Sequence, residues 1–99
     1  MKILVMPKPR QGVSRSDMEQ HAAAEIRAVW DLYAQGIVRE FYTRPDRGGG
    51  VILMVESPSV DAAQQALATL PLVERGLLDL DLYPLAPFTH LTRLFQAGS

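Results

Sequence analysis

The sequence predicts a small α+β domain with a ferredoxin-like order of elements. Segments with strand and helix periodicity follow one another as strand, helix, strand, strand, helix, strand, which is the split βαβ pattern. Proline- and glycine-containing turns separate most of these segments. A chain of this kind forms an antiparallel sheet with both helices on one face. We therefore expect one domain over residues 1–99, without a linker or repeat.

The first third of the chain should contain a strand and the longer helix. Residues 3–6 are an apolar run closed by prolines, as in a buried strand. Ser16 and Glu19 have the spacing of a capping box, which pairs the free amides at a helix start. Gly36 can end this helix in the left-handed conformation. The apolar positions at helical spacing are Met18, Ala22, Ile26, Val29 and Tyr33, with Trp30 alongside.

The middle of the chain predicts two strands joined by a glycine-rich turn. Alternation over residues 37–44 gives two expected faces: Val38, Glu40, Tyr42 and Arg44 on one, Ile37, Arg39, Phe41 and Thr43 on the other. Val51–Val55 is apolar on both faces, as in a central strand. The glycines at 48–50 join two strands and lack the lysine of a phosphate loop, so they indicate a flexible hairpin.

A second helix and a last strand complete the pattern. Ser57–Ser59 opens the helix, and Pro71 is expected to end it. Its apolar stripe is Val60, Ala63, Leu67 and Leu70. The strand covers Leu78–Leu82, and Pro84 indicates its end or a position at the sheet edge.

The last strand places leucines on one face and Asp79, Asp81 and Tyr83 on the other. The leucines should meet the helices. On the opposite face the carboxylates have two possible settings. In the first setting, the two carboxylates lie at a solvated sheet edge and pair with Arg39 or Arg44. In the second setting, two sheets enclose the carboxylates, and one of the two carries a proton near neutral pH. Spacing alone favours the first setting.

Composition and charge limit the functional classes. The formal net charge is −1 and the isoelectric point is about 6.1, which gives no electrostatic footprint for nucleic acid or an anionic membrane. The absence of cysteine excludes disulfides and a thiolate nucleophile. No apolar run is long enough for a signal peptide or membrane span, so we expect a cytoplasmic protein.

The C-terminal part resembles the muconolactone isomerase family. The resemblance rests on Leu70-Pro71-Leu72 at the end of the second helix and on the strand Asp79–Leu85, and it extends over most of residues 25–87. It implies a dimeric α+β barrel, in which two ferredoxin-like subunits place their sheets face to face with the helices outside. Residues 39–42 lack the tryptophan and histidine of the isomerase's second strand, and residues 73–77 lengthen a connection.

The candidate catalytic residues are Asp79, Asp81 and His21, the last with Glu25 four residues further along the helix. A histidine held by a carboxylate is suited to act as a general base. The alternative for His21 and Glu25 is an ordinary side-chain pair on the helix surface. The candidate substrate-binding residues are Arg39, Tyr42, Trp30 and Tyr83. Arginine binds a carboxylate in a forked fashion, and a tryptophan forms part of the core or walls a ligand cavity.

Together with these candidate residues, the resemblance implies a cofactor-independent enzyme of the isomerase or lyase type, without a metal, that moves a proton on a lactone or enolisable carbonyl compound. The alternatives are a non-catalytic small-ligand-binding protein and a structural oligomer. Two helices leave one sheet face bare, so a homodimer or higher homo-oligomer is expected. The apolar tail, residues 86–99, should pack on a neighbouring subunit.

Overall fold

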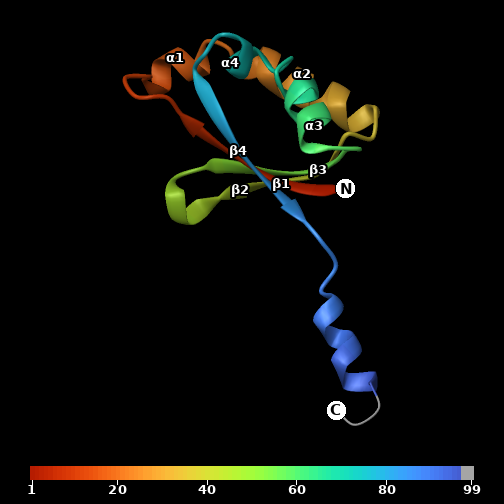
Figure 1. Cartoon of the computed structure of the whole chain (residues 1–99). Helices are drawn as coiled ribbons and strands as arrows, with labels where there is room; N and C mark the ends of the chain where they lie inside the picture. Colours follow the sequence, from red (N-terminus) through yellow and green to blue (C-terminus); the bar gives the residue numbers. More distant parts are fainter. Residues whose placement is uncertain (97–99) are drawn as a thin grey trace.

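The computed structural model describes residues 1–96 and has the predicted ferredoxin-like fold (Figure 1). The strands are β1 (Lys2–Pro9), β2 (Val38–Arg44), β3 (Gly50–Glu56) and β4 (Leu78–Leu85). The helices are α1 (Arg15–Glu19), α2 (Ala22–Ala34), α3 (Val60–Leu67) and α4 (Pro71–Glu74), with 3-10 helices η1 (Pro45–Arg47) and η2 (Thr89–Phe95). The sheet has the order β2-β3-β1-β4 with antiparallel neighbours, and α1–α4 lie on one side of it.

The first helical region starts earlier than predicted and consists of two helices. The capping box is formed by Ser14 and Asp17, not by Ser16 and Glu19. The Asp17 amide donates to Ser14 Oγ at 3.0 Å, and the Ser14 amide donates to Asp17 Oδ2 at 2.9 Å. Because the same three-residue spacing occurs twice in this segment, the sequence pattern did not fix the first turn. α1 ends at Glu19, and α2 begins after His21.

Replacing Ser14 by alanine should lower the free energy of unfolding by about 1 kcal/mol, because the Asp17 amide loses its acceptor. Ser16→Ala is the matched control and should change it by less than about 0.5 kcal/mol. Urea denaturation of the two variants measures both values. Equal effects would show that the cap at Ser14 adds nothing to stability.

Three prolines lie within strands, where the sequence predicted strand ends. β1 continues through Pro7 and Pro9, and β4 continues through Pro84 to Leu85. β1 pairs with β3 only from Lys2 to Val5, so both of its prolines lie where just one neighbour is present. β4 is an edge strand, which confirms the edge position considered for Pro84. Pro71 likewise opens α4, as the first helical residue.

A bulge in β2 changes the predicted face of one residue. Val38 pairs with Val55, whereas Glu40 pairs with Met54, so the register shifts between them. Val38 therefore points to the buried side with Val55, and the expectation that it shares a face with Glu40 was wrong.

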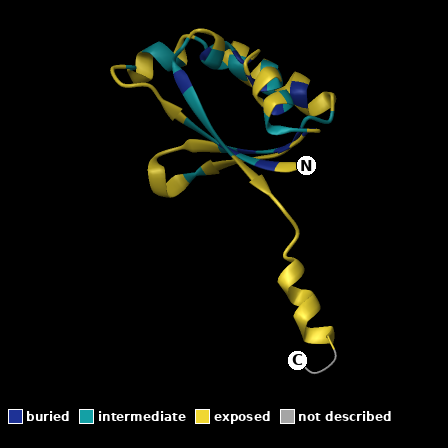
Figure 2. Cartoon of the chain, viewed as in Figure 1, coloured by how far each residue is buried: buried dark blue, intermediate teal, exposed yellow. Residues whose placement is uncertain are grey.

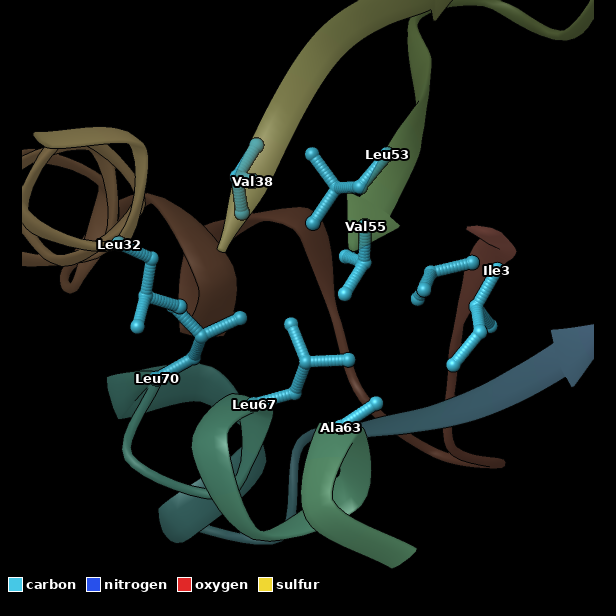
Figure 3. Close-up of a cluster of buried hydrophobic side chains, with 9 residues drawn as sticks. Ile3, Leu32, Val38, Leu53, Val55, Ala63, Leu67 and Leu70 are labelled. Carbon is cyan, nitrogen blue, oxygen red and sulfur yellow. The ribbon is translucent and has the colours of Figure 1, made fainter. Parts of the chain in front are cut away.

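The core lies between the sheet and α2–α4 (Figure 3). Ala63, Leu67 and Leu70 are buried against the sheet, which confirms the predicted stripe of the second helix. Leu78 is buried and the next two leucines of β4 pack against the core, as predicted. No helix within residues 1–96 is long and apolar enough to cross a membrane.

The apolar stripe predicted for the first helix is only partly buried. Leu32 is the buried residue of α2, whereas Ile26 is 70% exposed and Trp30 is 54% exposed. The helix therefore presents Ile26 and Trp30 outside the core. The described part of the tail is also exposed along its length (Figure 2).

Candidate functional site

A cavity of about 1140 Å³ opens between the helices and the sheet. Leu53, Leu78 and Leu80 of the sheet line it on one side, and Val29 and Trp30 of α2 line it on the other. The loop before α1 and the glycine turn after η1 also contribute residues to its lining. Most ligand cavities have such an apolar lining with a few polar groups. The cavity is thus the candidate binding site.

Glu25 is the partly buried carboxylate in this cavity. It projects from α2, and its Oε1 accepts a hydrogen bond from the Leu72 amide at 2.9 Å. Burial raises the pKa of Glu25 above its usual value, and the hydrogen bond from Leu72 opposes that shift. Because burial is the larger cause, the neutral acid is favoured relative to water. A carboxyl group in this setting is suited to exchange a proton with a ligand.

The fold positions Glu25 through the Leu70-Pro71-Leu72 step. Pro71 starts α4, so Leu72 is among the first helical residues, whose amides have no partner within the helix. Glu25 supplies the acceptor from a segment 47 residues away. From the sequence, Glu25 was expected only as a neighbour of His21. No local pattern marks the longer-range contact, although both of its ends lie in the region that resembles the isomerase family.

His21 does not form the side-chain pair considered for it. It is the N-cap residue of α2 without a side-chain capping bond, and it is not part of the cavity lining. The hydrogen bond between His21 and Glu25 joins the backbone amide of Glu25 to the backbone carbonyl of His21, at 2.8 Å.

Asp79 and Asp81 lie on the face of the sheet away from the helices. Asp79 Oδ1 accepts from Arg10 Nε at 2.8 Å, and Asp81 Oδ2 is 3.2 Å from Lys8 Nζ. Their side chains are 48% and 40% exposed. The predicted pairing with arginines of β2 was wrong, because two strands separate β2 from β4. Of those arginines, Arg44 pairs with Asp46, and Arg39 Nη1 donates to the Gly36 carbonyl at 3.5 Å.

In the dissociated monomer, Asp79→Asn and Asp81→Asn should each change the free energy of unfolding by less than about 1 kcal/mol, because exposed ion pairs add little to stability. Thermal denaturation at low and high salt measures the effect, and the small loss should shrink further at high salt. A loss of several kcal/mol in the associated protein would mean that these pairs are buried in the assembly.

Two of the predicted substrate-binding residues line the cavity. Trp30 and Tyr42 do so, whereas Arg39 and Tyr83 do not. The Tyr42 hydroxyl donates to Glu40 Oε1 at 2.8 Å. Phe41 is a third aromatic residue of the lining, so the α2 side and the β2 side of the cavity both offer a ring surface.

The cationic groups at the cavity are Arg15 of α1 and Arg47 of η1, both of which are exposed. Lys8 of β1 also contributes to the lining, but its Nζ is 3.2 Å from Asp81 Oδ2 on the other face of the sheet. Arg15 and Arg47 were not among the arginines predicted from the sequence, because only the folded chain brings these segments to the cavity. Among residues 1–96, no group of three or more histidine or carboxylate side chains is arranged to hold a metal ion.

The sheet order and the helices on one face define a ferredoxin-like α+β fold. A similar solved structure is 5-chloro-2-hydroxyhydroquinone dehydrochlorinase (TftG) from Burkholderia phenoliruptrix AC1100, in complex with 2,5-dihydroxybenzoquinone. The TM-score is 0.70 at 20% sequence identity, over 91% of this chain and 98% of the other. This similarity supports the fold. No protein-family model and no curated protein matches the sequence.

Proposed function

We propose that the chain is a homodimeric, cofactor-independent enzyme, resembling muconolactone isomerase, that transfers a proton on a small lactone or enolisable carbonyl compound. The substrate binds in the cavity between α2 and the sheet. The observation that carries this proposal is the half-buried Glu25 carboxyl in an otherwise mostly apolar cavity. We also propose that the enzyme acts in the cytoplasm, as its composition predicts.

In the proposed reaction Glu25 acts first as a base. The carboxylate takes a proton from the carbon next to a carbonyl group, and the C–H bonding electrons form the enolate. The Glu25 acid then returns the proton to a different carbon of the conjugated system, which gives an isomer with no net change in protons. The cationic side chains at the cavity, Arg15 and Arg47, are suited to stabilise negative charge on the substrate oxygen.

The similar dehydrochlorinase supports a ring compound as ligand. Its structure contains 2,5-dihydroxybenzoquinone, which is a small planar dione. In this chain, the aromatic side chains of Trp30 and Phe41 offer ring surfaces at the cavity for a ligand of that shape. Small hydroxyquinones and unsaturated lactones are therefore the first compounds to test.

The proposed dimer covers the sheet face away from the helices. Leu4, Met6, Ile52 and Met54 form a partly exposed apolar strip along its two central strands. A second copy would exclude water from this strip and also enclose Asp79 and Asp81. In that enclosed setting, the aspartate pair is the alternative proton carrier to Glu25, with Tyr83 beside it; His21 and Arg39 would need a ligand that reaches outside the cavity.

A second candidate function is binding without turnover. The mostly apolar lining favours it, because such a cavity holds a hydrophobic ligand with few directed contacts. A purely structural oligomer is the third alternative.

Thermal-shift measurements with unsaturated lactones, β-keto acids, phenols, hydroxyquinones and aromatic acids test the proposal. A ligand at 100 times its Kd adds about 2.7 kcal/mol, which raises Tm by several degrees. Each binding compound is then incubated with the enzyme in D₂O, and NMR follows both isomer formation and deuterium at either carbon of the conjugated system. Isomer formation or deuterium incorporation supports the enzyme, and binding with neither supports the binding protein. A folded protein that binds none of these compounds would overturn both.

A further inference from the structure

Two separate groups of exposed apolar side chains lie outside the core, and Ile26 and Trp30 of the first group also line the edge of the cavity. The first is on α2, where Ala23, Ile26, Arg27 and Trp30 line a depression of about 400 Å³ on the helix surface. We call it the α2 groove. The second is the C-terminal tail, whose large apolar side chains are 54–86% exposed: Phe88, Leu91, Leu94 and Phe95.

We propose that the tail of one copy docks in the α2 groove of a second copy. The tail leaves β4 and extends from the sheet on the side opposite to the helices (Figure 1). The α2 groove of the same copy belongs to the helical side. A second copy placed against the bare sheet face lies on the side into which the tail extends, so the tail runs toward that copy.

The dimensions agree with this arrangement. The tail from Leu85 to Phe95 combines an extended connection with the 3-10 helix η2, which gives a reach of roughly 25 Å. The path from the end of β4 to α2 of the partner crosses the spacing between the two sheets and the spacing between the partner's sheet and its helices, which together are about 20 Å. Each copy supplies one tail and one groove, so two-fold symmetry makes both contacts at once.

The area is also appropriate for a stable contact. The two phenylalanines and two leucines of each tail offer on the order of 500 Å² of apolar surface. Two tails together offer on the order of 1,000 Å² of apolar surface, which is at the lower end of the range of specific interfaces. The groove is polar at its edge, where Arg27 lies, and apolar at Ile26 and Trp30, as interface centres are. This inference depends on self-association and not on the catalytic part of the proposed function.

Trp30 is the only tryptophan of the chain, and it therefore reports directly on the groove. Acrylamide quenching of its fluorescence is measured without ligand in three full-length proteins. These are the wild type, the tail variant Leu94→Asp with Phe95→Asp, and the control His90→Asp with Thr92→Asp, which adds equal charge at polar tail positions. We expect quenching at least about twofold weaker in the wild type and control than in the tail variant, because a covered groove excludes water.

A mixing experiment identifies the copy that supplies the tail. The tail variant retains Trp30 and acts as the reporter, while Trp30→Phe has a native tail and no tryptophan fluorescence. Adding the second protein should shield the reporter's Trp30 as mixed dimers form. Equal quenching in wild type and tail variant would overturn the proposal. The proposal would also be overturned if Trp30 were shielded in the wild type at every protein concentration but not in mixed dimers. The tail would then contact the groove of its own chain.

Discussion

Glu25→Gln should lower turnover of the substrate at least about 100-fold while the protein stays folded. General acid–base groups typically contribute a factor of 10² to 10⁴, and glutamine cannot accept and return the proton. Glutamine retains a side-chain oxygen for the Leu72 amide, so the N-terminus of α4 keeps its acceptor. Initial rates for a compound identified by the ligand screen, together with deuterium incorporation, measure the loss.

The matched control is Glu74→Gln, an exposed carboxylate of α4 outside the cavity, which should leave turnover unchanged. Asp79→Asn and Asp81→Asn separate the two proposed proton carriers. If those variants are inactive and Glu25→Gln is active, the reaction takes place between the sheets and Glu25 is a structural acceptor. The ligand would then occupy the dimer interface.

The pH dependence of stability gives an independent test of Glu25. Its pKa in the folded protein is raised by burial above the ordinary value of 4.5. The folded state therefore binds more protons than the unfolded state as pH rises through the interval between these two values, and stability falls there. Glu25→Gln lacks this titration. The difference in Tm, variant minus wild type, should therefore increase as the pH rises from below 4.5, and it should become constant once Glu25 is ionised in the folded protein. A difference in Tm that does not change with pH would contradict the raised pKa of Glu25.

The sequence predicted the fold because its strongest patterns are local. The stripe of Ala63, Leu67 and Leu70 and the alternation from Leu78 to Leu82 each place apolar groups on one face, and both reach the core. Boundaries were less certain where two patterns compete. The two capping-box spacings near Ser14 and Ser16 are an example, since tertiary packing and the following break at His21 decide between them.

The candidate site was less predictable because its geometry depends on distant segments. Glu25 meets the Leu72 amide only after the helices pack together, and the strand bulge after Val38 moves its face. The acidic alternation at Asp79 and Asp81 was conspicuous in the sequence, but it marks the sheet face opposite to the cavity. Sequence alternation identifies a face of a strand and does not identify which side of the sheet holds a ligand.

Leu67→Ala should lower the free energy of unfolding by about 3 kcal/mol, because it removes a fully buried side chain between α3 and the sheet (Figure 3). For a domain of this size the loss corresponds to a decrease in Tm of roughly 10–20 °C. Gln64→Ala, at an exposed position of the same helix, is the control and should change the free energy by less than about 0.5 kcal/mol.

Leu67 belongs to the core and not to the cavity lining, so this variant separates stability from binding. The folded fraction of Leu67→Ala should keep the ligand affinity of the wild type, whereas Glu25→Gln should keep stability and lose turnover. Chemical denaturation and ligand titration below the new Tm measure the two quantities. If Leu67→Ala lost affinity in its folded state, the packing of α3 would determine the shape of the cavity, and core and site would form one unit.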